Sequence, residues 1–263
     1  MTTQHSTIQF PATILVSIAS VVALLFAFIP QSSFESPAPA SSGLSGSVVF
    51  DGKAPENQVW TVGKNRNTCG NSKTLDRIVV NSKGGVANSL IIVKGVKGSP
   101  SGMSAVKITQ KKCSYQPHLQ VAALGSSLTI ANEDDVLHNV HGYYIQSDHS
   151  TAFNFAQPIL HQQTPVKLVK PGLIEMQCDA GHTWMSAYVY VADNPYVVVT
   201  GADGSFSIPN LPPGTYTVQC WHEGWKVTGE SEGRPNFSDP KVSEQQVTVN
   251  AGSAARLEFH LSN

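Results

Sequence analysis

Short stretches in which apolar and polar residues alternate recur along the chain after residue 45. Alternation with a period of two places every second side chain on one face, which is typical of a half-buried β-strand. Gly and Pro separate these stretches, and no long segment after residue 30 shows an apolar period of 3.6 residues. The pattern therefore predicts an all-β protein. The clearest predicted strands are 127–132, 166–170, 174–178, 185–191 and 256–261.

A change of pattern at Asp193-Asn194-Pro195 predicts a boundary between two domains, 46–193 and 196–263. After the boundary, residues 201–204 (Gly-Ala-Asp-Gly) form a hairpin signal between two short strands. Five or more short strands in fewer than 70 residues favour a small β-sandwich. The earlier stretch Asn88–Val93 is almost entirely apolar, so we expect a strand buried on both faces.

The N-terminus carries the one strongly apolar run, Ala12–Ile29, and no Asp, Glu, Lys or Arg occurs between Met1 and Phe34. Residues 1–31 are thus interpreted as a signal peptide or a signal anchor helix, followed by a Ser/Pro/Ala linker over 32–45. Small residues at Ala38-Pro-Ala40 favour cleavage, although they lie some distance beyond the apolar run 12–29. The length of that run is at the lower edge for a membrane span. Either way we expect a periplasmic or extracytoplasmic protein, either released or anchored in the inner membrane.

Charge and cysteine usage narrow the class of protein. The net charge is −1 and only 13% of residues are charged, so there is no basic surface for nucleic acid. No Ser-His-Asp order or Walker loop is present, and no catalytic residue is assigned. Export favours disulfides, and four cysteines allow three two-bridge connectivities. Cys220 has inward parity and is expected as a buried free thiol, whereas Cys69 and Cys113, in polar turn-like contexts, are expected to form a disulfide.

The stretch from Cys178 to Met185 gathers a thiol, an imidazole and a thioether within eight residues. Strand parity places Cys178 at the end of one inward row and Met185 at the start of the next, with His182 in the loop between them. Thiolate, thioether and imidazole together select copper over magnesium or calcium. A trigonal copper site with a weak axial Met needs one more His from elsewhere in the chain.

The segment Asn132-Glu-Asp-Asp-Val-Leu-His138-Asn139-Val, followed some 40 residues later by C-x3-H-x2-M, resembles the cupredoxins, the plastocyanin-like blue copper proteins. The resemblance implies one copper ion bound by His138, Cys178, His182 and Met185. It also implies that Asn139 braces the site by hydrogen bonding. The Cys–His and His–Met spacings differ slightly from those of the best-known members, which affects the expected geometry and potential rather than the ligand set.

Residues 196–261 resemble the carboxypeptidase regulatory-like, or transthyretin-like, domain through Val-Thr-Gly-Ala-Asp-Gly-Ser-Phe-Ser-Ile-Pro-Asn-Leu-Pro-Pro-Gly-Thr-Tyr. The combination is similar to exported bacterial cupredoxin-like proteins, some of which are labelled methylamine-utilisation proteins. The implied fold class is all-β: a cupredoxin-like Greek-key sandwich followed by a small transthyretin-like β-sandwich.

Several residues near the motif allow two interpretations. His141 has outward parity and is by default a surface residue, although it could supply an extra copper ligand. Trp184 could shield the metal from water or simply pack. The acidic run 133–135 is most simply a solvated loop, and could also steer a cationic partner. A pair between His222 and Glu223 is expected to be structural. The remaining histidines are expected at the surface: His118, His149, His161 and His260.

These features favour a one-electron carrier that is not an enzyme and that meets an unidentified redox partner protein near the exposed edge of His182. A copper-handling protein, or a module that binds protein or glycan without electron transfer, is the alternative. A third class is a copper enzyme with an open coordination position and His141 as a ligand.

Overall fold

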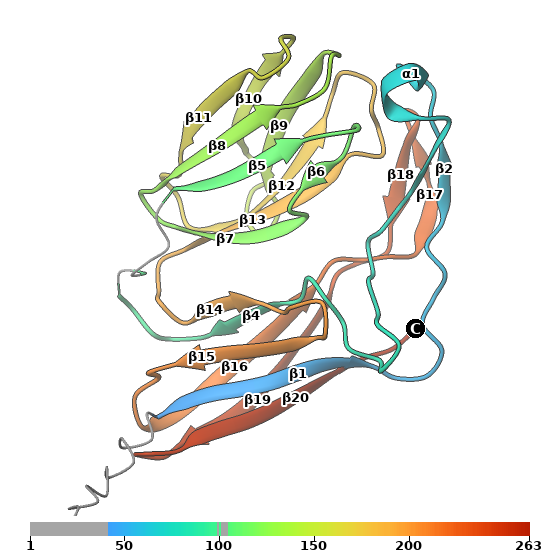
Figure 1. Cartoon of the computed structure of the whole chain (residues 1–263). Helices are drawn as coiled ribbons and strands as arrows, with labels where there is room; N and C mark the ends of the chain where they lie inside the picture. Colours follow the sequence, from blue (N-terminus) through green and yellow to red (C-terminus); the bar gives the residue numbers. More distant parts are fainter. Residues whose placement is uncertain (1–41, 99, 101–104) are drawn as a thin grey trace, which may run out of the picture. The chain divides into compact units, whose positions relative to one another are not determined.

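The computed structural model describes residues 42–98, 100 and 105–263 (Figure 1). Within these residues the secondary structure is almost entirely β, with one four-residue helix, α1 (Arg66–Cys69), which confirms the all-β prediction. The predicted N-terminal helix over 1–31, and most of the predicted linker, lie outside the described residues. In the part that is described, no helix has the length and apolarity needed to cross a membrane.

The first sandwich consists of a five-stranded and a four-stranded sheet. Their strand orders are β10-β9-β12-β13-β7 and β11-β8-β5-β6. Two pairs are parallel, β13 with β7 and β5 with β8, so the chain crosses between the sheets as a Greek key requires. The strands are β5 (Val106–Gln110), β6 (Tyr115–Gln116), β7 (Leu119–Ala123), β8 (Ser127–Asn132), β9 (His138–Tyr144), β10 (Thr151–Gln157), β11 (Gln163–Lys167), β12 (Gly172–Cys178) and β13 (Ser186–Ala192).

The inward rows of β9 and β12 lead directly to the predicted ligands. On β9, His138, Val140, Gly142 and Tyr144 are buried, and the residues that alternate with them are more exposed. On β12, the buried row ends at Met176 and Cys178. Because β9 and β12 are antiparallel neighbours with Cys178 opposite Val140, the start of one strand lies beside the end of the other. The two rows therefore bring His138 and Cys178 to the same end of the sandwich.

The second sandwich is built from a three-stranded sheet, β15-β1-β20, and a four-stranded sheet, β14-β4-β16-β19. Its core includes Leu44, Ile91, Val218 and the fully buried Phe259. The strands are β1 (Gly43–Phe50), β4 (Leu90–Val93), β14 (Val197–Val199), β15 (Ser205–Pro209), β16 (Gly214–His222), β19 (Lys241–Val249) and β20 (Ala254–Leu261).

Sheet membership differs from the predicted boundaries 46–193 and 196–263. Strand β1 pairs in parallel with β20, and β4 lies between β14 and β16, so both early strands belong to the second sandwich. β1 also begins at Gly43, inside the predicted linker. The expectation for the apolar stretch is confirmed, because all four residues of β4 are buried. These pairings join residues more than 100 positions apart, and alternation within a strand carries no information about its partner.

Two other stretches differ from what their local pattern indicates. The turn at 201–204 forms, with the amide of Gly204 bonded to the carbonyl of Gly201, but the strands on either side enter different sheets. The stretch 153–163 shows no clear apolar period in the sequence, yet it contains most of β10. β10 is an edge strand in its sheet and pairs only with β9 through a register shift, which explains its irregular apolar pattern.

Two small hairpins complete the structure (Figure 1). The first, which we call the cap, runs from Val59 to Thr74 and contains β2 (Val59–Thr61), α1 and β3 (Ser72–Thr74). The predicted disulfide between Cys69 and Cys113 is present and links the cap to the first sandwich. The second hairpin is formed by β17 (Val227–Ser231) and β18 (Arg234–Phe237), and its Val227 and Phe237 pack against the core of the first sandwich.

Candidate metal centre

Three of the four predicted ligands converge at one end of the first sandwich. His138 begins β9, Cys178 ends β12, and His182 lies in the loop that follows. The Sγ of Cys178 is 3.8 Å from Nδ1 of His138 and 3.5 Å from Nδ1 of His182, and the two Nδ1 atoms are 3.1 Å apart. All three side chains have no exposed surface. The cluster therefore presents two imidazole nitrogens and one sulfur to a single buried point.

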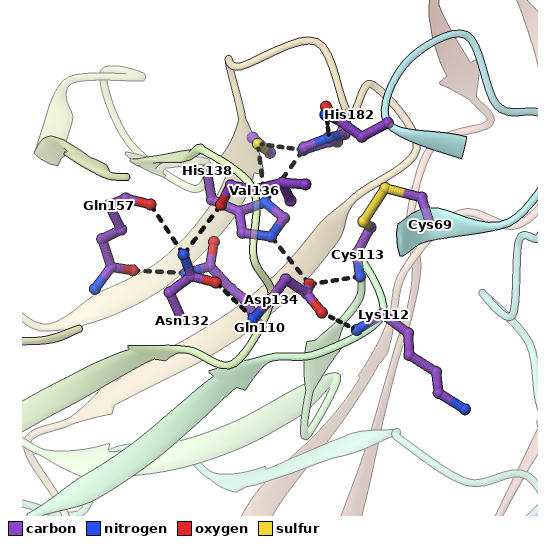
Figure 2. A network of polar contacts seen from close by, with 12 residues as sticks. Cys69, Gln110, Lys112, Cys113, Asn132, Asp134, Val136, His138, Gln157 and His182 are labelled. Atoms are coloured by element: carbon purple, nitrogen blue, oxygen red, sulfur yellow. Dashed lines mark hydrogen bonds and ion pairs between the residues drawn. A yellow bond between two sulfur atoms is a disulfide. The ribbon is translucent and has the colours of Figure 1, made fainter. Parts of the chain in front are cut away.

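Both imidazoles are oriented by a hydrogen bond on the opposite side of the ring. Nε2 of His138 donates to a carboxylate oxygen of Asp134 at 3.0 Å, and Nε2 of His182 donates to Oδ1 of Asn65 at 3.0 Å (Figure 2). A proton held on Nε2 leaves the lone pair of the neutral ring on Nδ1, facing the sulfur. This is the arrangement in which a partner outside the ligand set fixes the tautomer of a metal-binding histidine.

Asp134 corrects the prediction of a solvated acidic loop at 133–135. It is 3% exposed and accepts the backbone amides of Lys112 and Cys113 at 2.6 and 2.7 Å. Burial alone would raise the pKa of Asp134, but the bonds from His138 and from the two amides lower it below its ordinary value. The carboxylate thus stays ionised beside His138. Only Asp135 of the run is exposed, while Glu133 pairs with His161.

Cys178 ionises more readily than an ordinary cysteine to the thiolate, which is the form that binds metals. Burial opposes its ionisation, but the imidazoles of His138 and His182 and the backbone amides of Asn139 and Ala180 outweigh burial and lower its pKa to about 6. The pKa of His138 is raised, because Asp134 and Cys178 together overcome the effect of burial on its charged form. Asn139 therefore acts on the thiolate through its backbone. Its side-chain Oδ1 is buried and has no hydrogen-bond partner among the described residues.

The other two predicted neighbours of the site are also buried. Met185 is 1% exposed, and its amide donates to the carbonyl of His182 at 3.0 Å, which closes the loop. The ring of Trp184 lies 5.4 Å from that of His182, and its indole N–H bonds to the carbonyl of Cys113. Trp184 thus packs on the imidazole of His182 and is itself hydrogen-bonded to Cys113 of the disulfide.

The expected exposed edge of His182 is absent, because the cap covers the ring. Asn65 contacts its Nε2, and the Lys64 ammonium donates to the carbonyl of Ala180 at 2.9 Å. Since the sequence places the cap more than 100 residues before the loop, parity could not indicate this cover. Docking on His182 itself is therefore ruled out for the described conformation.

His118, His141 and His222 lie apart from the cluster. His141 faces outward, as its parity predicts, and its Nδ1 lies 2.7 Å from the carboxylate of Asp179. His118 is not an ordinary surface residue, since its Nε2 contacts the buried carboxylate of Glu223. Glu223 also pairs with Arg77 at 2.5 Å, whereas His222 bonds only to its backbone carbonyl. The expected His222–Glu223 pair is thus replaced by a structural Arg77–Glu223–His118 cluster.

Three residues that shape the site were not predicted: Asn65, Asp134 and Arg234. Asp134 precedes His138 by four residues, and that spacing was the only available sequence signal. The loop between β12 and β13, residues 179–185, is called the ligand loop below. Asn65 contacts His182 of this loop from 117 residues away, and Arg234 contacts Thr183 and the preceding Cys178 from 51 and 56 residues away. No local sequence pattern marks either residue.

The donor set fits copper. Two imidazole nitrogens and one thiolate suit copper, whereas hard cations prefer oxygen ligands. The buried carboxylate of Asp134 is engaged with His138 and with two amides, so it serves the imidazole. The cluster is thus suited to a single soft or borderline ion.

Solved structures that resemble part of this chain are only distantly similar to it. The chain is similar to a purple cupredoxin from Nitrosopumilus maritimus (18% identity, TM-score 0.29), over 33% of this chain and 99% of the other. It is similar to amicyanin from Paracoccus versutus (16%, 0.30), over 39% and 97%, and to a pseudoazurin from Sinorhizobium (19%, 0.29), over 35% and 76%. No curated protein has a significantly similar sequence.

A family profile for the carboxypeptidase regulatory-like domain matches residues 179–262. The match begins in the ligand loop, although β13 belongs to the five-stranded sheet of the first sandwich. It does not include β1 and β4, which complete the second sandwich. The chain thus joins a two-sheet β-sandwich, with its ligand loop between β12 and β13, to a segment that is similar to the carboxypeptidase regulatory-like domain.

Proposed function

We propose that the protein is an exported copper protein that carries one electron at a mononuclear site. The observation that supports this most strongly is the convergence of two Nδ1 atoms and one sulfur, with both Nε2 atoms already engaged by Asn65 and Asp134. His138, His182 and Cys178 would bind the ion, and Met185 is the candidate for a weak fourth ligand. When bound, copper supplies the exchange between its cuprous and cupric states.

The protein's part is to keep the ligands still while the charge changes. His138 and His182 are each held by a hydrogen bond on Nε2, and Cys178 receives two backbone amides at a site where all three side chains are fully buried. Ligands that do not move on reduction keep the reorganisation energy small, which a fast one-electron carrier requires. The full burial of His138, Cys178 and His182 favours a carrier over an enzyme, which would need a coordination position open to substrate.

An electron would reach the site through the residues that cover it. Because the cap lies over His182, a redox partner protein would dock on the cap, and the electron would pass through side chains such as Asn65 rather than across a bare imidazole edge. The Cys69–Cys113 disulfide fits an oxidising, extracytoplasmic compartment. Attachment to the inner membrane by residues 1–31 belongs to the same proposal.

The test is to load the purified protein with one equivalent of Cu(II) and to record visible absorption and electron paramagnetic resonance together. We expect an intense thiolate-to-copper band with narrow copper hyperfine splitting, both lost in Cys178→Ser. Bound copper with wide splitting and no such band would instead favour copper handling or an open site. The absence of stoichiometric binding would contradict the proposal altogether.

A further inference from the structure

The guanidinium of Arg234 spans the loop that carries the ligands. Its Nη2 donates to the carbonyl of Cys178 at 3.1 Å and its Nη1 to the carbonyl of Thr183 at 3.2 Å. Nη2 also lies 3.4 Å from the carboxylate of Asp179. A single side chain therefore connects the first part of the loop with the residue that follows His182.

Arg234 comes from the second hairpin, within the range that matches the carboxypeptidase regulatory-like domain. The hairpin is anchored near the site by Phe237, whose ring lies 3.7 Å from the guanidinium carbon of Arg77. Arg77 in turn donates to Ser186, the residue after Met185. Residues Glu230 and Gly233 of the hairpin share one groove with Gly181 and Thr183 of the loop. The hairpin is thus fixed to both ends of the ligand loop.

We propose that Arg234 is a positioning residue of the metal centre, through which the second hairpin sets the geometry and the reduction potential of the site. This inference rests on the proposed function for its metal readout. The second hairpin then has a stated role, namely to hold the ligand loop.

The side-chain type suits this role. A guanidinium is a rigid planar fork with several N–H donors, so it can reach two carbonyls at once, whereas a lysine ammonium acts as a point charge. Its positive charge lies beside Cys178, and Asp179 offsets part of it. Reduction makes the site more negative by one charge, so a nearby cation favours the reduced form. Removing the charge of Arg234 should therefore lower the reduction potential. Replacing its planar guanidinium should make the ligand loop more mobile, because the two carbonyls would no longer be bound by one group.

The experiment compares four forms of the full protein: wild type, Arg234→Gln, Arg234→Lys and Arg256→Gln. Arg256, exposed on β20 of the second sandwich, is the matched control. The first readout uses the metal-free protein and measures the rate at which iodoacetamide alkylates Cys178, followed by mass spectrometry of its peptide. The second uses the Cu(II)-loaded protein and measures the potential, and the copper affinity in competition with a chelator.

With Arg234→Gln we expect faster alkylation, a lower potential and copper affinity reduced on the order of tenfold, the range for residues that orient ligands. Arg234→Lys should keep the potential near that of wild type but alkylate as fast as Arg234→Gln. Arg256→Gln should match wild type throughout. If Arg234→Gln alkylates at the wild-type rate, the positioning role is wrong. If alkylation rises but wild type shows no copper–thiolate band, the loop role stands and the proposed electron carrier fails.

Discussion

Replacing Asn65 tests how the cap controls the second imidazole. Its Oδ1 accepts the Nε2 hydrogen of the buried His182 at 3.0 Å. Asn65 has a φ of 54°, a left-handed conformation that Gly and Asp tolerate and Ala does not. Asn65→Gly therefore removes the acceptor without straining the backbone, and Asn65→Asp keeps an acceptor in place.

The expected loss of copper affinity depends on whether the substitution destabilises the metal-free or the metal-bound protein. In the metal-free protein, His182 can turn or exchange tautomers once its acceptor is gone. With Nδ1 bound to a metal, the Nε2 hydrogen must point into the gap that Asn65 leaves. An unsatisfied buried donor costs about 1–3 kcal/mol. Because Asn65 is itself exposed, water can enter the gap, so the low end of that range applies. About 1.4 kcal/mol corresponds to a tenfold loss of affinity.

Chelator competition with Cu(I) and Cu(II) measures the change. We expect Asn65→Gly to bind copper about tenfold more weakly, within the 10–100-fold range for such partners, and Asn65→Asp to bind no more weakly than wild type. If Asn65→Gly stays within about twofold of wild type, the hydrogen bond does not hold the metal-bound ring, and the reasoning from this contact is wrong.

Two further predictions follow from buried charges. In the metal-free protein, alkylation of Cys178 requires the thiolate. Because the pKa of Cys178 is lowered to about 6, the alkylation rate should reach half its maximum near pH 6 and decrease at lower pH. A midpoint near 9, the ordinary pKa of a thiol, would contradict the pairing of the thiolate with the imidazoles. Glu223→Gln should lower the free energy of unfolding in urea by about 3–5 kcal/mol, because Arg77 stays buried without its partner. Glu244→Gln, which breaks an exposed pair with Lys94, should lower the free energy of unfolding far less, and equal losses would refute the role of burial.

Cys178 and His138 were accessible from sequence because each lies at the end of a strand with a clear period of two. Cys178 closes the buried row that contains Met176, and His138 opens the row that contains Val140. Because side chains alternate between the two faces of any strand, the buried face can be predicted without knowing which strands lie beside it. The resemblance to the cupredoxins then grouped these residues, and the distances between them agree with that grouping.

The residues that support the ligands follow from long-range contacts instead. β1 and β4 join the second sandwich by pairing with strands far along the chain, and Asn65 reaches His182 across 117 positions. Asp134 illustrates a different difficulty. An acidic run is ordinarily solvated, and its burial depends on Asn132, whose Oδ1 accepts the Asp134 amide and whose amide group bonds to the carbonyls of Val136 and Gln157 (Figure 2).

The central claim is that Cys178 binds copper as a thiolate together with His138 and His182. It is tested most directly by the visible and paramagnetic resonance spectra of the protein loaded with one equivalent of Cu(II), compared with Cys178→Ser. The account predicts an intense charge-transfer band with narrow hyperfine splitting in the wild type and neither feature in the variant. A band that survives the substitution, or a wild type that binds no copper, would contradict it.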